Sequence, residues 1–217
     1  MHLGLQGKVA LITGGSKGIG LATAISLSRE GAKVAILARN EEQLQEAAVH
    51  IANLTEGEVL AIQADVTLEA DCQRAVEQTI QRFGSLHILV NNAGTSAAQP
   101  FEEVGTELWR QDLELKLFGA IHCSRYAIPY MRQAGGGSIV NITTSAAKTP
   151  PASSLPTSVR PCRRTCINEC DEQRPGIRSD SCEHRLHWEN SQQSNRERLE
   201  ARGARADLGR VCIGSQA

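Results

Sequence analysis

The chain has 217 residues, a formal net charge of −1 and 41% hydrophobic residues, which suits one domain with a buried core. This charge balance gives no reason to expect nucleic acid or a membrane surface as a partner. No apolar run approaches the roughly 20 residues that cross a bilayer, and residues 1–8 lack the layout of a secretory signal, so we expect a cytoplasmic protein.

Strands and helices are expected to alternate along the first two thirds of the chain. In chain order, apolar runs predict strands at residues 8–13, 34–38, 58–63, 87–90 and 138–142. Between them, apolar residues at helical spacing predict helices at 19–29, 41–53, 68–83 and 106–132, the second of them capped by Asn40. Strands that alternate with helices form parallel sheets with right-handed crossovers. We therefore expect an α/β fold, a Rossmann-type doubly wound parallel sheet.

A glycine-rich turn, Thr-Gly-Gly-Ser-Lys-Gly-Ile-Gly at residues 13–20, joins the first predicted strand to the first helix. Glycine allows a sharp turn and a close approach of the backbone, and the amides at a helix start attract an anion. In this context the turn predicts a pyrophosphate site; a tight turn without a ligand is the alternative. The residues assigned to the site are Gly14, Ser16, Lys17, Ile19 and Gly20.

The residue after the second strand selects the cofactor. An acidic side chain there would accept hydrogen bonds from a ribose 2′-hydroxyl and repel a 2′-phosphate. This sequence has Arg39 instead, and Lys17 is a second nearby cation. Both suit a 2′-phosphate, so we expect NADP(H) rather than NAD(H). The alternative is that Arg39 is only a solvated surface residue.

The spacing Thr-Gly-x-x-x-Gly-x-Gly resembles that of the short-chain dehydrogenase/reductase (SDR) family. Two further motifs agree in order, Ala-Asp-Val at residues 64–66 and Asn-Asn-Ala-Gly at residues 91–94. The resemblance covers about residues 5–159. It implies that Asp65 lies near the adenine, and that the segment with Asn92, Ala93 and Gly94 steadies the sheet beside the cofactor.

The resemblance also implies hydride transfer between the nicotinamide and a small-molecule carbonyl or alcohol. In that family a Tyr acts as general acid or base and a Lys four residues later lowers its pKa, because a phenol of pKa near 10 must be tuned toward neutrality. The family's serine position falls on Thr144 or Ser145, which are the candidate catalytic residues. The Tyr position falls on Thr157 or Ser158, and the Lys position on Pro161 or Cys162. The Tyr-x-x-x-Lys dyad is therefore absent, which marks an atypical member.

The remaining candidates for proton transfer lie on the long predicted helix. Tyr126 and Tyr130 are expected to pack or to face the surface. Lys116 stands where the family usually has an Asn. It could replace the missing acid, but a solvated or ion-paired lysine is the favoured interpretation.

The composition changes after Val159. Residues 160–217 hold eleven Arg, no Lys and five Cys, and only eight of these 58 residues are Ile, Leu, Val or Trp. That share is below the roughly 20% at which a segment struggles to bury a core. We therefore divide the chain into an incomplete NADP-binding Rossmann domain at 1–159 and an aberrant, disordered tail at 160–217. The family's next helix and sixth strand are not expected, so the C-terminal third of the fold is missing or disordered.

A change of reading frame near Val159 or Arg160 would account for this tail. Codons chosen for Arg164 to Gln173, read one base after the start of the Arg163 codon, give Gly-Ala-Arg-Ala-Leu-Met-Asn-Ala-Met-Ser, an amphipathic helix. The rival interpretation is a zinc site in the tail, formed by Cys162, Cys166, Cys170, Cys182, His184 and His187. For the chain as a whole, an SDR-type oxidoreductase is the first hypothesis. A catalytically inactive NADP(H)-binding protein, or a defective frameshifted product, is the second.

Overall fold

A computed structural model describes residues 3–96, 99–100, 103–143 and 177–179 of the chain. All of them lie in one compact unit, Met1–Asp180. Within these ranges no helix combines the length and the apolar character needed to cross a membrane.

The sheet is parallel throughout and has the order β3-β2-β1-β4-β5-β6. Its strands are β1 (Val9–Thr13), β2 (Lys33–Ala38), β3 (Val59–Gln63), β4 (Ile88–Asn91), β5 (Gly137–Asn141) and β6 (Ile177–Ser179). The order reverses between β1 and β4, because the chain builds the sheet outward from β1 in one direction and then from β4 in the other. The prediction of a doubly wound α/β sheet is confirmed.

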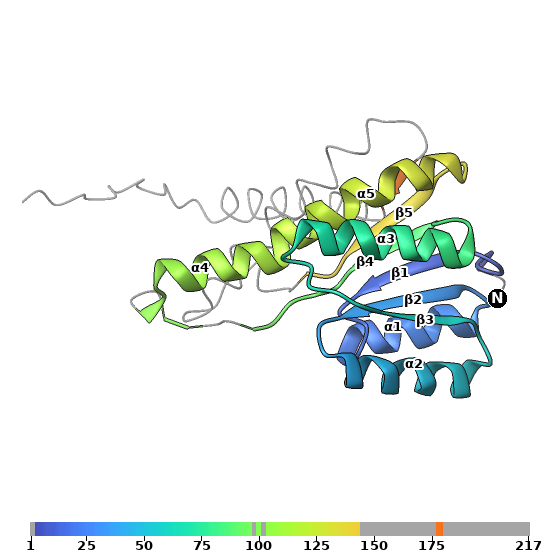
Figure 1. The fold of residues 1–217 in the computed structure, drawn as a ribbon, viewed down its shortest axis with the longest axis horizontal. Helices are drawn as coiled ribbons and strands as arrows, with labels where there is room; N and C mark the ends of the chain where they lie inside the picture. Colours follow the sequence, from blue (N-terminus) through green and yellow to red (C-terminus); the bar gives the residue numbers. More distant parts are fainter. Residues whose placement is uncertain (1–2, 97–98, 101–102, 144–176, 180–217) are drawn as a thin grey trace, which may run out of the picture. The chain divides into compact units, whose positions relative to one another are not determined.

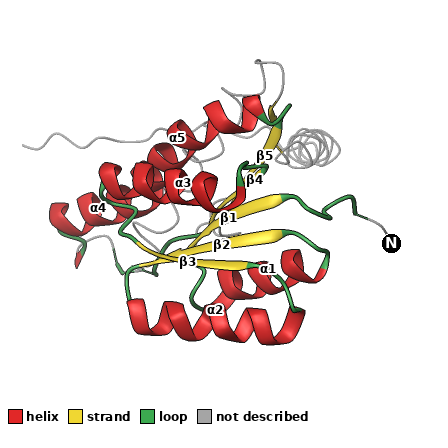
Figure 2. Cartoon of the chain, turned by 45° about the vertical axis from the view of Figure 1, so that its right-hand side comes forward, coloured by secondary structure: helices red, strands yellow, loops and turns green. Residues whose placement is uncertain are grey.

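Helices cover both faces of the sheet (Figures 1 and 2). One face carries α1 (Gly18–Arg29) and α2 (Glu41–Thr55), and the other carries α3 (Glu69–Phe83) and α5 (Gly119–Gln133). Asn40 caps α2 as expected, since its side chain accepts a hydrogen bond from the Gln43 amide at 2.8 Å.

The long helix predicted at 106–132 is interrupted. It consists of α4 (Thr106–Leu113), a π-helical turn η2 (Glu114–Phe118) and α5. The predicted helix is therefore present over its expected length, but the π-helical turn within it was not expected. A single wide turn leaves the apolar spacing on either side nearly unchanged, so the sequence pattern does not reveal it.

Two apolar clusters fill the space between the sheet and its helices. Side chains alternate along a strand, so Val9 and Leu11 of β1 face the α3 and α5 side, while Ala10 and Ile12 face α1 and α2. Every residue of β1 is buried. Burial on both faces explains why the strand is a continuous apolar run rather than an alternating one.

Strand β6 departs from the expectation that no sixth strand follows Val159. It pairs in parallel with β5, residues 177–179 lying beside 137–139. Ile177-Arg178-Ser179 contains a single apolar residue, so neither length nor pattern identified this strand. The division of the chain at residue 159 stays a prediction.

Candidate functional site

A cleft of about 1020 Å³ lies beside the carboxyl ends of the central strands. In parallel sheets of this kind, ligands bind where the strand order reverses, which here is between β1 and β4. The structure brings nine of the ten expected cofactor-binding residues to this cleft: Gly14, Ser16, Lys17, Ile19, Arg39, Asp65, Asn92, Ala93 and Gly94. The tenth, Gly20, is buried directly beneath the glycine turn.

The glycine turn requires glycine at two positions for different reasons. Gly14 has φ +67°, in the left-handed region, and its amide donates to the Leu37 carbonyl of β2 at 2.8 Å. A Cβ at Gly20 would collide with the Gly14 carbonyl oxygen and with Asn92 Nδ2. The turn thus carries its backbone close to β2 and β4. It also presents the start of α1, where the N-cap residue Lys17 makes no side-chain capping hydrogen bond.

A clasp of hydrogen bonds ties the end of β1 to the segment after β4. Thr13 Oγ1 accepts from the amides of Asn92 and Ala93, both at 3.0 Å. In return, Asn92 Nδ2 donates to the carbonyl oxygens of Thr13 and Gly14, both at 3.1 Å. These four bonds fix the glycine turn against the Asn-Asn-Ala-Gly segment, so the floor of the cleft is a rigid junction of two strands.

A second amide contact joins β4 to its other neighbour. Asn91 Nδ2 donates to Asn141 Oδ1 of β5 at 2.9 Å and to Ser124 Oγ of α5 at 3.3 Å. Asn91 is 1% exposed, and burial strengthens the need for these bonds. Near the cleft, strands β1, β4 and β5 are therefore linked by side-chain hydrogen bonds as well as by the backbone hydrogen bonds of the sheet.

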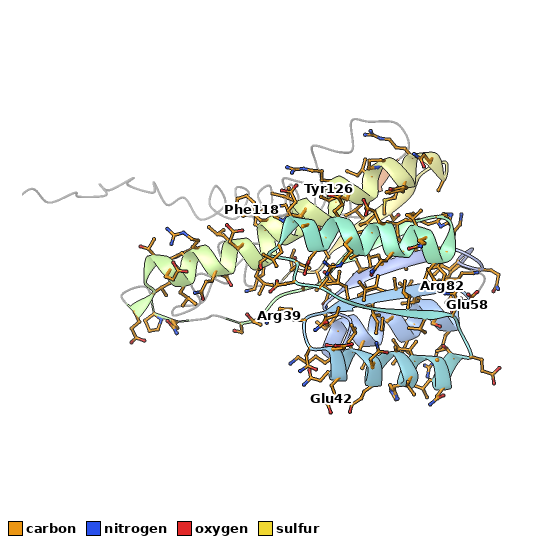
Figure 3. All side chains as sticks on the ribbon, viewed as in Figure 1. Arg39, Glu42, Glu58, Arg82, Phe118 and Tyr126 are labelled. Carbon is orange, nitrogen blue, oxygen red and sulfur yellow. The ribbon has the colours of Figure 1, made fainter. Side chains whose placement is uncertain are left out.

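Arg39 follows the last residue of β2, just before α2 begins at Glu41 (Figure 3). Its side chain is 64% exposed, and its Nη1 lies 4.0 Å from Asp65 Oδ2. Lys17 lines the same cleft. Two cationic residues therefore line the cleft, and β2 itself ends without a carboxylate.

Asp65 is held in place by its own loop. Its Oδ1 accepts from the amide and the hydroxyl of Thr67, at 3.0 and 2.9 Å. The Asp65 amide donates to Asp71 Oδ2 at 2.8 Å. This backbone hydrogen bond, followed by the Arg74 guanidinium, lowers the pKa of Asp71. The loop that brings Asp65 to the cleft is thus secured by a carboxylate at the start of α3.

Lys116 lies in the π-helical turn and lines the cleft. Its side chain is 5% exposed and its Nζ donates to Asp112 Oδ1 at 2.7 Å, where the Asp112 side chain is 2% exposed. The expectation of an ion-paired lysine is confirmed, but the pair is buried rather than on the surface. Asp112 was missed by the sequence analysis. Its position four residues before a lysine on one helix was the available signal.

Neither tyrosine of the chain lines the cleft. Tyr126 donates from its hydroxyl to Glu69 Oε1 at 3.0 Å, and this bond raises the pKa of Tyr126. Arg125 contacts the same carboxylate oxygen at 2.6 Å. Tyr130 is half-buried against the core. The expectation that both tyrosines pack or face the surface is confirmed.

Other expected residues lie outside the described part of the chain. These are the candidate catalytic residues Thr144 and Ser145, the family's Tyr and Lys positions at 157–158 and 161–162, and the cysteines and histidines of the tail. Within the described part, the cleft is also lined by residues that the sequence analysis did not single out. They include Leu37, Gln43, Thr95 and Thr143. Asn40, predicted only as a helix cap, and Ile142, predicted only as a strand end, line it too.

Comparison with known proteins identifies this arrangement. The family described as short chain dehydrogenase matches residues 8–156. The 11-beta-hydroxysteroid dehydrogenase A of Sesamum indicum is 37% identical over 143 residues, which are 65% of this chain and 41% of that protein. The short chain dehydrogenase/reductase astE of Aspergillus oryzae is 37% identical over 148 residues, which are 67% of this chain and 57% of that protein. The chain thus spans about half the length of these relatives.

Solved structures show the same fold. L-sorbose reductase from Gluconobacter frateurii, complexed with NADPH and L-sorbose, superposes with a TM-score of 0.79 and 33% identity, covering 82% of this chain and 69% of that one. An NAD+-bound xylitol dehydrogenase superposes with a TM-score of 0.76 and 29% identity, covering 80% of this chain and 68% of that one. From the motifs, the strand order and these matches, we conclude that the chain belongs to the short-chain dehydrogenase family.

Proposed function

We propose that the cleft binds NADP(H), and that the protein transfers a hydride between this cofactor and a small-molecule carbonyl or alcohol. The observation that carries the choice of NADP(H) is the pair of cations, Arg39 and Lys17, in a cleft wall where β2 ends without a carboxylate. A guanidinium binds phosphate in a bidentate manner. Family membership alone does not make this choice, because one similar structure holds NADPH and another holds NAD+.

The described residues fit a dinucleotide. A Cβ at Gly14 would lie 3.0 Å from both Ala93 Cα and Asn92 Nδ2, so glycine lets the turn approach the segment after β4 closely. In this proposal the amides that open α1 hold the pyrophosphate. Arg39 and Lys17 hold the 2′-phosphate, Asp65 lies at the adenine, and the segment from Asn92 to Gly94 borders the nicotinamide riboside. The bound nicotinamide would supply or accept the hydride, and Thr144 or Ser145 would contact the substrate oxygen.

Substitution of Arg39 tests the cofactor choice. Charge-assisted hydrogen bonds contribute about 1.5–3 kcal/mol, so Arg39→Ala should weaken NADPH binding roughly 10- to 100-fold. NADH, which lacks the 2′-phosphate, should bind the variant about as well as it binds the parent chain. Calorimetric titration with both cofactors measures this. Arg132→Ala, an exposed arginine in the last turn of α5, is the matched control and should change neither affinity. Equal or tighter binding of NADH by the parent chain would refute the proposal.

The second candidate is a nucleotide-binding protein without turnover, since Thr or Ser stands at the family's tyrosine position in this sequence. Among the described residues no tyrosine reaches the cleft, and the Tyr126 hydroxyl is engaged by Glu69. Oxidation of NADPH in the presence of a panel of ketones and aldehydes separates the two candidates. Turnover clearly above the rate without protein excludes the inactive form. Tight NADPH binding without any turnover excludes the oxidoreductase.

The remaining parts of the proposal concern the rest of the chain. We propose a cytoplasmic protein whose partners are the cofactor and its small-molecule substrate. We also propose that residues 160–217 derive from a change of reading frame. The nucleotide sequence decides this last point: if the actual codons do not give a helix-forming sequence in the alternative frame, the idea is wrong.

A further inference from the structure

One ion pair among the described residues is buried on both sides, and it lies at the cleft. The side chains of Lys116 and Asp112 are 5% and 2% exposed. In every other ion pair formed within the described residues, the cation is at least 38% exposed. Taking two charges out of water is expensive, and a buried pair often stabilises a fold no better than apolar residues would. Stability alone therefore gives no reason for this pair.

Only the lysine of this pair lines the cleft. Lys116 is part of the cleft wall, together with Gly94, Leu115 and Thr143, whereas Asp112 is not. The Asp112 carboxylate accepts a hydrogen bond from the Lys116 ammonium at 2.7 Å. The lysine also sits in the π-helical turn Glu114–Phe118, a kind of turn that is frequent at functional sites.

Gly94 makes room for the lysine. Its φ is not in the left-handed region, so its backbone conformation does not demand glycine. A Cβ at this position would lie 3.2 Å from Lys116 Cγ and Cε and 3.3 Å from Cδ. These contacts are tighter than ordinary van der Waals distances. Glycine at position 94 therefore permits the lysine stem to pass along the segment after β4, which lines the cleft.

We infer that Lys116 binds the substrate oxygen that gains negative charge during hydride transfer, with Asp112 as its positioning residue. This inference rests on the proposed function. When hydride forms the new C–H bond at a carbonyl carbon, the π electrons of the C=O bond move onto the oxygen, and a proton from water completes the alcohol. A preorganised cationic N–H donor in a site of low dielectric stabilises that developing charge. In this inference Lys116 supplies that donor.

Two ligands of the same shape test this without requiring turnover. Benzoate carries a negative oxygen, whereas benzamide is neutral. The chain is first titrated with NADP+ and then, at saturation, with each ligand by calorimetry. Saturation also occupies Lys17 and Arg39, which under the proposed function contact the cofactor. We expect benzoate to bind at least about tenfold tighter than benzamide, and Lys116→Met to abolish that preference.

Control variants distinguish the effect of the Lys116 charge from an effect of the substitution on folding. Lys33→Met removes an ion-paired lysine away from the cleft, and should leave the preference for benzoate intact. Because Lys116→Met leaves a buried carboxylate, the double variant Asp112→Asn with Lys116→Met removes both charges. It should fold, bind NADP+ within about threefold of the parent and show no preference.

The outcomes are distinct. If the parent chain does not bind NADP+, the proposed function fails and this inference fails with it. If NADP+ binds but benzoate has no advantage, or if the advantage survives in the double variant, the inference alone is wrong. Loss of the preference in both Lys116 variants, with NADP+ binding retained, supports it.

Discussion

Replacing Thr13 with valine tests the clasp between β1 and the segment after β4. Thr13 is 2% exposed, and its hydroxyl accepts from the amides of Asn92 and Ala93. Valine has nearly the same shape but no acceptor, so two amides lose their partner. An unsatisfied buried donor costs about 1–3 kcal/mol. Since Asn92 and Ala93 are half-buried, we take the lower end for each and expect a loss of about 2–3 kcal/mol.

The matched control is Thr79→Val. Thr79 is 0% exposed, and its hydroxyl donates to the Ala75 carbonyl at 2.8 Å within α3. That carbonyl lies within the helix, where the backbone ladder supplies it with a donor. The loss should therefore stay near 0.5–1 kcal/mol. The two variants make the same chemical change at equally buried sites and differ in the number of amides left without an acceptor.

Urea unfolding followed by circular dichroism measures both variants. Thr13→Val should lower the free energy of unfolding by about 1–2 kcal/mol more than Thr79→Val, which removes a sizeable part of the roughly 5–15 kcal/mol typical of a folded protein. For a chain of this size the total loss corresponds to a fall of about 4–12 °C in Tm. If the two variants unfold within about 0.5 kcal/mol of each other, the clasp does not contribute as argued.

Three further predictions follow from other contacts. His87 Nδ1 accepts a hydrogen bond from the Val9 amide at 3.1 Å, and burial, with a smaller effect of the Lys8 charge, lowers the pKa of His87. The unfolded chain therefore binds this proton more readily than the folded chain. The stability that is present above about pH 6.5 should be lost as the pH falls. In His87→Gln, the urea midpoint of unfolding should change less between about pH 7.5 and pH 5.5 than it does in the parent chain. An unchanged pH dependence would contradict the assignment of this loss of stability to His87. Asp71→Ala removes the acceptor of the Asp65 amide and should cost about 1–2 kcal/mol and weaken NADPH binding, whereas Glu77→Ala, an exposed carboxylate on the same helix, should do neither. Gly20→Ala places a Cβ against the Gly14 carbonyl and Asn92 and should abolish NADPH binding. Its control is Gly105→Ala, at a position with open space around it, which should change the free energy of unfolding by less than about 1 kcal/mol.

The doubly wound parallel sheet could be predicted from the sequence because both faces of its strands are covered. Each of the first five strands is then a run of apolar residues bounded by turn residues, and the alternation with helices fixes the parallel arrangement. The glycine turn was located for a similar reason. Gly14 and Gly20 answer steric demands of the backbone, and such demands leave a local trace in the sequence.

Features that depend on contacts across the fold were not recoverable in this way. Whether Lys116 is solvated or buried depends on how the π-helical turn faces Asp112 and Gly94, and no local pattern records that. The clasp is similar, because Thr13 and Asn92 are 79 residues apart. Strand β6 was not predicted because a segment of three residues with one apolar side chain looks like a loop in the sequence. Only its pairing with β5 makes it a strand.

Because the strand order reverses between β1 and β4, two separate halves of the chain line the cleft. One half supplies the glycine turn and Arg39, and the other supplies Asn92, Gly94 and Lys116. A fragment ending after β3 would contain the glycine turn without the Asn92 side chain, which donates hydrogen bonds to it. Association of the two halves should therefore be visible as slow hydrogen exchange at the Asn92 and Ala93 amides. A bound dinucleotide that contacts both halves should slow this exchange further.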